Sequence, residues 1–463
     1  MLAAMASTFT GCKDDEYNPV QNEADKIGAP ELSVAEGETV ETSVDKIVLT
    51  YAKPVSLNSL VNITLNDAAV TATVNEEDRR IVEVSVALAP GTDYTLSVPE
   101  RAVAVIGTPW FAPEVTLHFA TAAKPAPEVN FDALVNANAT PEAVAVRNFL
   151  VEQHGQHVLS GAMANVNNNN DFADWIYSIT AKYPAYTCYD FVHLPESGQN
   201  WIDYSNIAPA TKQWENNGLV GYMWHWRVPT NEQAWQDKDY SKYGFYNDDT
   251  DFSIGKALEE GTWEHECILA DIDRVADVFK ALEAAGVPVL WRPLHEAAGN
   301  VASGDNGSWF WWGREGVEKT KELWKLMYDR LVNHHGINNL IWVWTAQYGK
   351  GFESEIARAY PGAEFVDIVG VDLYDNLNEV QAAAYNALLD QTEGKKLIAL
   401  TENGPLPDVN ITTAPWAFFM EWYTNDAHIN KPAEDGFGNT TEAYKACFDN
   451  PFVLNREDMP TLK

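Results

Sequence analysis

Two glutamates each close a short apolar run, at points where a strand would give way to a loop. The first run is Pro288–Glu296 (PVLWRPLHE) and the second is Lys396–Glu402 (KLIALTE). Hydrolysis of a glycosidic bond usually needs two carboxylates that flank the bond. The carboxyl ends of the strands of a (β/α)8 barrel meet at one face, which brings such a pair together. The two glutamates therefore predict glycosidase chemistry if the elements around them form that barrel.

From residue 129 to residue 463, apolar strand-like runs alternate with amphipathic segments. Helical spacing is visible in Ile272–Leu282, Glu318–Asn333 and Val380–Asp390, and a glycine follows each segment within a few residues. Strands that are apolar on both faces and alternate with helices are typical of a parallel barrel. The eight strand candidates are, in order, His157–Met163, Pro184–Phe191, Leu219–Trp226, Val287–Glu296, Leu340–Thr345, Val366–Tyr374, Lys396–Glu402 and Trp416–Trp422.

This order predicts a (β/α)8 TIM barrel with Glu296 at the end of strand four and Glu402 at the end of strand seven. An open, doubly wound sheet is the alternative for the same pattern. No GxGxxG or Walker-type loop follows the first strand, which argues against nucleotide binding. The plainer alternative for the glutamates is that each only forms an ion pair, for instance with Arg292.

The sequence around the two glutamates resembles the motifs of one family of enzymes. The stretch WRPLHEAAGN…GSWFWWG (Trp291–Gly313) is similar to the signature of glycoside hydrolase family 26, best known for β-mannanases. Most related barrel families place Asn before the acid/base, whereas family 26 has the histidine found here as His295. The phrases GVDLYD, TENG and NPFVLNREDMP fit the same family, and the resemblance covers Val129–Lys463. Asn300–Gly307 is longer than in the shortest family members.

The resemblance implies a role for each carboxylate. Glu296 matches the general acid/base, which must be protonated, so we expect the second carboxylate and apolar walls to raise its pKa. Glu402 matches the nucleophile, which must be ionised to form a glycosyl-enzyme intermediate. His295 matches a histidine that contacts the sugar, or else is a buried orienting residue. Arg292 is expected to support the nucleophile, with a structural ion pair as the alternative.

Further residues are implied to bind substrate. His225, at the end of strand three, matches a sugar-binding histidine, against the alternative of a satisfied barrel histidine. Tyr374 is placed to hold the nucleophile, and Trp422 to stack under the sugar at the cleavage point. Trp309 matches a tryptophan of the cleft, whereas its neighbours Trp311 and Trp312 are expected to pack in the core. The implied site set is Glu296, Glu402, His225, His295, Trp309, Tyr374, Trp422 and Arg292.

The expected activity is that of a retaining endo-β-1,4-mannanase acting on mannan, galactomannan or glucomannan. A β-glucanase or xylanase of the same family, an exo-acting enzyme that releases mannobiose, and a non-catalytic glycan-binding lipoprotein are the alternatives. Two carboxylates suffice for the chemistry, so we expect no metal and no organic cofactor. We also expect a monomer.

Residues 28–123 have an all-β pattern. Short alternating runs separated by turn residues predict a small β-sandwich, and the phrase ALAPGTDYTLSVP resembles bacterial Ig-like domains. We expect a spacer or a minor glycan-binding role for this domain. Residues 124–128 form a Pro-containing linker to the barrel domain. The strand-like runs are Ile47–Tyr51, Val61–Leu65, Val82–Leu88, Tyr94–Val98 and Val115–Phe119.

Residues 1–27 indicate a signal remnant and a tether. The apolar, small-residue stretch that ends at Cys12 resembles a bacterial lipobox, in which the cysteine becomes the lipidated N-terminus. Lys13–Glu16 resembles the acidic tag that directs lipoproteins of Bacteroidetes-type bacteria to the cell surface. We therefore expect an outer-membrane lipoprotein, exposed at the cell surface or on the periplasmic face. The alternative is a disordered tail.

Composition excludes several classes of partner. Asp and Glu outnumber Lys and Arg by 67 to 31, giving a net charge of -36. Such a surface repels nucleic acid and anionic lipid but suits a neutral glycan held by aromatic faces. The four cysteines are scattered without metal-ligand spacing, so we expect no structural zinc, and Cys188 is interpreted as a core residue.

Overall fold

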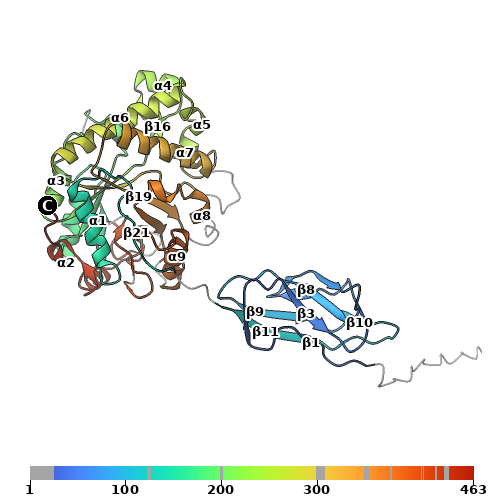
Figure 1. The fold of residues 1–463 in the computed structure, drawn as a ribbon. Coiled ribbons are helices and arrows are strands. Elements are labelled where there is room, and N and C mark those ends of the chain that lie inside the picture. Colours follow the sequence, from blue (N-terminus) through green and yellow to red (C-terminus); the bar gives the residue numbers. More distant parts are fainter. Residues whose placement is uncertain are drawn as a thin grey trace, which may run out of the picture. The chain divides into compact units, whose positions relative to one another are not determined.

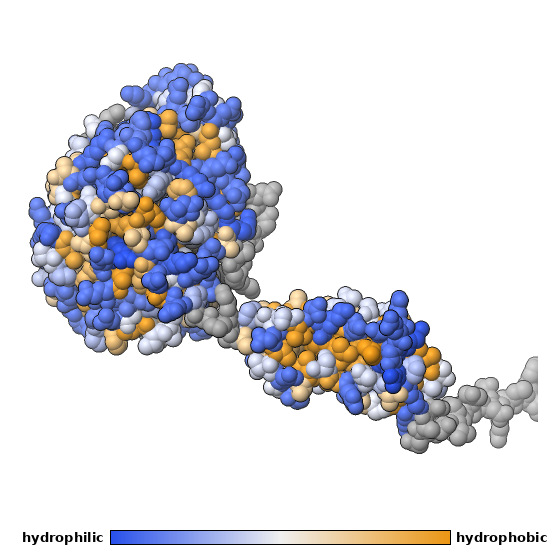
Figure 2. All heavy atoms as spheres, in the orientation of Figure 1, coloured by the Kyte–Doolittle hydropathy of each residue, from blue (hydrophilic) through white to orange (hydrophobic). Residues whose placement is uncertain are grey.

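The chain forms two compact units, Met1–Pro125 and Ala126–Lys463. A computed structural model describes residues 26–122, 127–198, 202–298, 308–348, 355–375, 378–407, 409, 411–422, 425–431 and 437–463. Cys12 and the stretch Asn300–Gly307 lie outside the described residues. Each unit has its own hydrophobic core. Hydrophilic residues cover much of the visible surface of the barrel unit, as the acidic composition leads one to expect (Figure 2).

The N-terminal unit is a β-sandwich, as predicted. Its two main sheets have the strand orders β1-β3-β8-β7 and β2-β11-β9-β5-β6, and β4 pairs with β10. Inward residues alternate with outward ones along the long strands, so that Ile47, Leu49 and Leu96 are fully buried. The strands are β1 (Glu31–Leu32), β2 (Glu38–Val40), β3 (Lys46–Thr50), β4 (Val55–Leu57), β5 (Thr64–Leu65), β6 (Ala68–Ala69), β7 (Ala72–Val74), β8 (Ile81–Ser85), β9 (Asp93–Val98), β10 (Val103–Val105) and β11 (Val115–Thr121).

The second unit is a closed barrel of parallel strands, which confirms the predicted fold class. The barrel order is β13-β14-β15-β18-β19-β20-β21-β22, and Ala162 pairs with Glu421 to close it. All eight predicted strands contribute to it. They are β13 (Gly161–Met163), β14 (Tyr186–Asp190), β15 (Leu219–Met223), β18 (Val289–Arg292), β19 (Leu340–Gln347), β20 (Ile368–Leu373), β21 (Leu397–Asn403) and β22 (Phe419–Glu421).

Helices surround the barrel strands (Figure 1). Thr140, Thr262 and Thr440 cap three of these helices, since each side chain accepts a backbone N–H in the first turn. The helices are α1 (Pro141–Gln153), α2 (Asp171–Thr180), α3 (Ala208–Glu215), α4 (Glu232–Asp237), α5 (Ile254–Ala257), α6 (Trp263–Ala284), α7 (Val317–Tyr328), α8 (Glu355–Ala359), α9 (Asn378–Gln391) and α11 (Thr441–Phe448). No helix in the described ranges is long and apolar enough to cross a bilayer.

The interior of the barrel is filled by side chains that need small neighbours. Tyr186 of β14 is 1% exposed, and a Cβ on Gly221 of the next strand would lie 2.1 Å from its hydroxyl oxygen. A Cβ on Gly161 of the preceding strand would lie 2.8 Å from the same ring. Glycines on both sides therefore make room for one large aromatic residue. Cys188, two residues along β14, is fully buried, which confirms that it is a core residue.

The C-terminal segment pairs with the chain just before the first barrel strand. β12 (Val158–Leu159) pairs in parallel with β23 (Val453–Leu454), and Asn455 donates from its amide to the carbonyl oxygen of Phe448 at 2.9 Å. The predicted first strand is divided at Ser160 into β12 and β13. The hydroxyl of Ser160 donates to the carbonyl oxygen of Leu454 at 3.1 Å. The motif NPFVLNREDMP (residues 450–460) therefore has a structural role.

Strand four is shorter than the predicted Val287–Glu296. β18 ends at Arg292, so Glu296 lies four residues beyond it. Pro293 has no N–H for a ladder, and Leu294 and Glu296 have φ values of 52° and 50°, in the left-handed region. These conformations cannot continue a strand, and they turn the chain so that Glu296 faces the mouth of the barrel.

Candidate active site

The two glutamates share one cavity at the carboxyl ends of the barrel strands. The cavity has a volume of about 560 Å³. It brings together every predicted site residue except Arg292, which lies beneath it, and Cys12, which is not described. Its lining is His225, Tyr246, His295, Glu296, Trp309, Phe310, Gln347, Tyr374, Glu402 and Trp422. A pocket with a few polar groups among aromatic walls is the expected form of a ligand site.

Glu296 is held by its main chain and by β19. Its N–H donates to the carbonyl oxygen of Thr345 at 3.3 Å. The amide of Gln347, oriented so that its hydrogen bonds are satisfied, donates to the two carboxylate oxygens at 2.8 and 3.1 Å. Burial raises the pKa of Glu296 well above its usual value, and the nearby carboxylates of Asp372 and Glu402 raise it further. Glu296 is therefore suited to stay protonated and donate a proton.

Glu402 lies inside β21 and is fixed through both of its oxygens. The hydroxyl of Tyr374 donates to Oε1. Nη2 of Arg292 donates to Oε2 at 3.1 Å. Donors on both oxygens hold this carboxylate in one orientation. Tyr374 is itself 40% exposed, because its ring lies at the cavity wall while its hydroxyl points toward Glu402.

A third carboxylate, Asp372, completes a buried charge cluster that sequence reasoning missed. One oxygen of each of Glu296, Asp372 and Glu402 lies within 4.8 Å of the others. Arg292 donates to Asp372 as well as to Glu402, and the Thr401 hydroxyl donates to Asp372 at 3.0 Å. Burial raises the pKa of Asp372, and Arg292 opposes this shift. The guanidinium supplies the positive charge that three clustered carboxylates need.

Arg292 is positioned by further contacts inside the barrel. Its Nε donates to the Thr345 hydroxyl at 3.0 Å, and its Nη1 lies 3.3 Å from the sulfur of Met223. The side chain is 1% exposed. Arg292 was expected either to support Glu402 or to form a simple ion pair. Its ion pairs with Asp372 and Glu402 are compatible with both expectations.

The two histidines differ in their partners. Nδ1 of His225 lies 2.6 Å from the carboxylate of Asp190, at the end of β14. His295 is 1% exposed, and its Nδ1 has no hydrogen-bond partner among the described residues. Burial lowers the pKa of His295 well below its usual value, and Arg292 and His225 lower it further. His295 is therefore neutral, and the two rings lie 4.7 Å apart at the cavity wall.

Aromatic side chains form the rest of the wall. Trp309 and Trp422 line the cavity, whereas Trp311 and Trp312 are fully buried, as expected from the sequence. Nε1 of Trp312 donates to the carbonyl oxygen of His295 at 2.8 Å, so this packing residue also supports the turn before Glu296. The backbone N–H of Trp422 donates to the carbonyl oxygen of Asn403 in β21 at 2.9 Å.

Two aromatic wall residues were not predicted. Tyr246, which follows β17 (Tyr243–Gly244), forms a bridge with Phe310 and stacks on it with ring centroids 5.7 Å apart. Phe310 stands inside the predicted WFWWG motif, so its neighbours were a usable signal. Tyr246 carries no comparable sequence signal, because its place depends on pairing between two distant loops.

The barrel, with carboxylates from β21 and from the turn after β18 facing one cavity, is the arrangement of the (β/α)8 glycoside hydrolases. A family model described as glycosyl hydrolase family 26 matches residues 135–458. The chain belongs to glycosyl hydrolase family 26.

Relatives and a solved structure agree with this membership. A mannan endo-1,4-β-mannosidase from Thermothelomyces thermophilus is 35% identical over 73% of this chain and 66% of its own length. Mannan endo-1,4-β-mannosidase B from Piromyces sp. is 34% identical over 71% of this chain and 54% of its own length. The chain thus spans about half to two thirds of the length of these relatives.

The solved structure is the family 26 domain of an endo-β-mannanase/endo-β-glucanase from Prevotella bryantii. It is 36% identical and superposes with a TM-score of 0.63. The match covers 70% of this chain and 98% of that domain.

Proposed function

We propose that the protein is a retaining endo-β-1,4-mannanase. The observation that carries this proposal is the close pair Glu296 and Glu402, whose nearest oxygens lie within 4.8 Å of each other across an aromatic cavity. Retaining glycosidases hold their two carboxyl groups about 5–5.5 Å apart, whereas inverting enzymes need about 6.5–9.5 Å to fit a water molecule. The spacing therefore favours direct attack by one carboxylate.

In the first step, an ionised oxygen of Glu402 attacks the anomeric carbon. Glu296 gives its proton to the glycosidic oxygen, so the C–O bond breaks and the leaving sugar departs as an alcohol. Charge moves from Glu402 to Glu296, and the product is a covalent glycosyl-enzyme ester. Tyr374 and Arg292 hold the attacking carboxylate in place during this step.

In the second step, Glu296 acts as a base. It removes a proton from a water molecule, whose oxygen attacks the same anomeric carbon and displaces Glu402. Glu296 is protonated again and Glu402 is again ionised, so one water is consumed for each bond cleaved. Two inversions at one carbon retain its configuration.

Mannan is the substrate class that the similar proteins support best. Both curated relatives bear the name mannan endo-1,4-β-mannosidase. The neutral, aromatic wall of Trp309, Phe310 and Trp422 suits the faces of pyranose rings. A β-glucanase of the same mechanism is the second candidate, since the Prevotella protein is named for both activities. The remaining alternatives are a xylanase, an exo-acting enzyme that releases mannobiose, and a non-catalytic glycan-binding protein. The substrate test below distinguishes between them.

Variants of the two glutamates test the mechanism. On a mannan, Glu296→Ala and Glu402→Ala should each lower kcat by about 10³-fold or more. On an aryl β-mannobioside with a dinitrophenolate leaving group, Glu296→Ala should still form the intermediate, because that leaving group needs no proton. Glu402→Ala should not. The exposed Glu379→Gln is the matched control, and equal activity of all variants would overturn the proposal.

A panel of glycans tests the substrate. Reducing ends released from galactomannan, glucomannan, lichenan and xylan should rank the mannans first. A time course of products should begin with long oligosaccharides, since an endo enzyme cuts within chains. Early accumulation of mannobiose alone would support exo attack instead. Predominant cleavage of lichenan would support the glucanase reading.

For the N-terminal part of the chain, we propose an Ig-like spacer behind a lipid anchor at Cys12. The order of strands in the sandwich supports the first part, and the run of small residues before Cys12 supports the second. The anchor would hold the enzyme at the outer membrane, facing the cell surface or the periplasm. Incorporation of labelled palmitate that Cys12→Ser abolishes, with antibody labelling of intact cells, would test this. Light scattering on the purified protein tests the expected monomer.

A further inference from the structure

A carboxylate that the two-step reaction does not use lies directly behind His225. Asp190 ends β14 and is 3% exposed. Its Oδ1 accepts the backbone N–H of His225 at 2.9 Å, and its Oδ2 lies 2.6 Å from Nδ1 of the same residue. The strand register pairs Asp190 with Met223, two residues before His225. One carboxylate therefore fixes both the main chain and the ring of this histidine.

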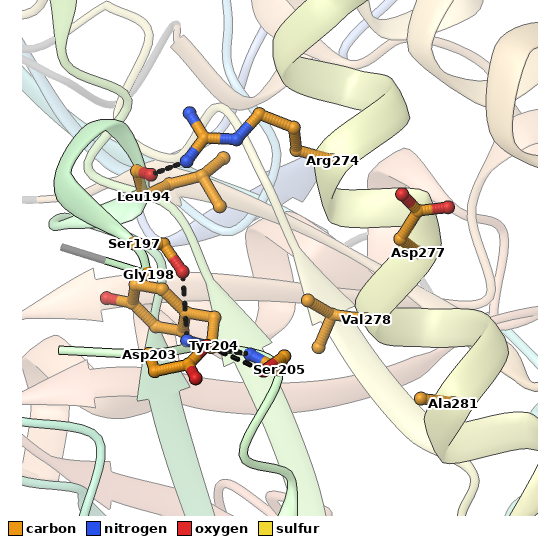
Figure 3. A pocket seen from close by; sticks show the side chains of 10 residues that line it. All are labelled: Leu194, Ser197, Gly198, Asp203, Tyr204, Ser205, Arg274, Asp277, Val278 and Ala281. Atoms are coloured by element: carbon orange, nitrogen blue, oxygen red, sulfur yellow. Dashed lines mark hydrogen bonds between the residues drawn. The ribbon is translucent and has the colours of Figure 1, made fainter.

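Asp190 is held in turn from outside the cavity. The hydroxyl of Tyr204 donates to the carbonyl oxygen of Asp190 at 2.6 Å. Tyr204 lies on the wall of a separate hollow between the loop after β14 and α6, where Ser197 accepts its N–H at 3.0 Å (Figure 3). Arg274 of α6 donates to Leu194 of the same loop. The loop after β14 therefore supports the main chain of Asp190, and α6 holds this loop in turn.

The ring of His225 has little freedom to turn. Its centroid lies 5.0 Å from that of Phe245, 4.7 Å from that of His295 and 5.2 Å from that of Trp422. An ionised carboxylate only accepts hydrogen bonds, so Nδ1 carries a hydrogen. In a neutral imidazole the other nitrogen, Nε2, is then an acceptor, and a sugar hydroxyl is a suitable donor.

We propose that Asp190 is a positioning residue for the cleavage reaction. It holds His225 in one rotamer and in the Nδ1–H tautomer, so that Nε2 accepts a hydrogen bond from a hydroxyl of the sugar that stacks on Trp422. This inference rests on the proposed glycanase function. It adds a requirement that the two glutamates alone do not impose: Nε2 of His225 must accept a hydrogen bond from the sugar and not donate one.

The variant Asp190→Asn reverses that direction with almost no change in shape. The asparagine oxygen would keep the bond from the backbone N–H of His225, which leaves its NH2 group facing Nδ1. An NH2 group donates, so Nδ1 would become the acceptor and the hydrogen would move to Nε2. The ring would then present a donor to the sugar.

The kinetic test is a double-mutant cycle on a β-1,4-mannan oligosaccharide. We expect Asp190→Asn and His225→Ala each to lower kcat/KM by about 10- to 100-fold, since each removes one well-placed hydrogen bond. In the double variant the loss should equal that of His225→Ala alone, because Asp190 acts through that ring. Additive losses, or wild-type kcat/KM in Asp190→Asn, would overturn the proposal.

Asp367→Asn is the matched control. Asp367 is also a buried carboxylate that accepts backbone N–H groups, those of Val135 and Trp342, but it lies before β20 at the opposite end of the barrel. We expect it to lower Tm as Asp190→Asn does and to leave kcat/KM within about twofold of wild type. A similar loss of kcat/KM in this control would mean that destabilisation alone explains the Asp190 result.

A second readout needs no substrate. Nitrogen-15 NMR of histidine-labelled protein reports which ring nitrogen carries hydrogen, and His225→Ala identifies the signals. Wild type should show His225 as Nδ1–H, and Asp190→Asn should show Nε2–H. If the protein cleaved no glycan, the proposed function would fail while this result could still hold. An Nε2–H signal in active wild-type protein would instead overturn the inference alone.

Discussion

The hydroxyl of Tyr374 donates a hydrogen bond to Oε1 of Glu402, across the ends of two neighbouring strands. β20 pairs directly with β21, and Leu373 is in register with Asn403. The contact thus follows from strand pairing rather than from a mobile loop. A ring of Phe437 packs against Tyr374 with centroids 5.6 Å apart, which further limits where the phenol can sit.

Removal of this hydroxyl should slow the chemical step. Tyr374→Phe keeps the ring and deletes one donor to a carboxylate, and such charge-assisted hydrogen bonds contribute about 1.5–3 kcal/mol. We therefore expect kcat on mannan to fall by about 10- to 100-fold with KM changed less than about threefold. Tyr177→Phe, on an exposed tyrosine of α2, is the control. Unchanged kcat in Tyr374→Phe would show that Arg292 alone holds the nucleophile.

The alkaline limb of the pH–rate profile should respond to Asp372. In the proposed mechanism Glu296 must be protonated in the first step, so we expect kcat/KM to fall as pH rises through the pKa of Glu296. Asp372 helps to raise that pKa. Asp372→Asn removes a negative charge, which lowers the pKa of Glu296 and therefore moves the limb to lower pH.

The position of the limb is the quantity to measure, since the loss of the ion pair with Arg292 will also reduce the maximal rate. Asp367→Asn should leave the limb where it is. A limb that stays in place or moves to higher pH in Asp372→Asn would contradict the prediction.

The barrel could be predicted from sequence because its strands are apolar on both faces and its helices are amphipathic. The exact ends of the strands could not. Pro293 and the left-handed turns at Leu294 and Glu296 end strand four early, and only the fold around them forces those conformations. Glu296 nevertheless lines the same cavity as Glu402, as predicted.

The residues that line the cavity were largely predictable, whereas the residues that hold them in place were not. Asp372 lies near the end of β20 and two residues before Tyr374, and alternate residues of a strand face the same side, so this spacing was a usable signal. Asp190 and Gln347 have no such signal, since each acts on a residue of another element. Tyr246 depends on contact between two loops. Through-space partners of this kind need the assembled barrel.

Arg292 should be required for stability as well as for rate. Its guanidinium joins two buried carboxylates, and loss of one partner from a buried ion pair costs about 3–5 kcal/mol. We expect Arg292→Met to lower Tm strongly and to abolish activity. Arg292→Lys should keep part of the stability but lower kcat by more than about tenfold, because an ammonium group cannot reproduce the planar fork.

Thermal unfolding and kinetics measured on the same samples would separate the two effects. Arg330→Lys, in a partly exposed pair with Asp273, is the control for the substitution itself. If Arg292→Met proved more stable than wild type, the cluster would not need its positive charge.

Glu421 should make the stability of the protein depend on pH. It is fully buried beside Trp422, and its Oε1 accepts from the amide of Asn439 and the hydroxyl of Tyr444. Burial raises its pKa from 4.5 to about 8, although these two hydrogen bonds oppose the shift. Asn439 also donates to Gly404, which ties the end of β21 to β22.

The sign follows from proton linkage. Between the unfolded pKa near 4.5 and the folded pKa near 8, the folded protein binds more protons at Glu421 than the unfolded chain does. The free energy of unfolding contributed by this group therefore falls as pH rises through that window, by an amount on the order of a few kcal/mol. Glu421→Gln removes the titrating group and should flatten the fall of stability between about pH 5 and pH 8.

Denaturant unfolding followed at half-unit pH steps would measure this slope. Glu442→Gln, at an exposed position of α11, should leave the slope of the wild-type protein unchanged, whereas Glu421→Ala should lose stability at every pH because it leaves Asn439 and Tyr444 without their acceptor. An identical slope in Glu421→Gln and wild type would mean that the buried glutamate does not titrate between those limits. In that case Glu421 would already be ionised in the folded protein throughout the range from about pH 5 to pH 8.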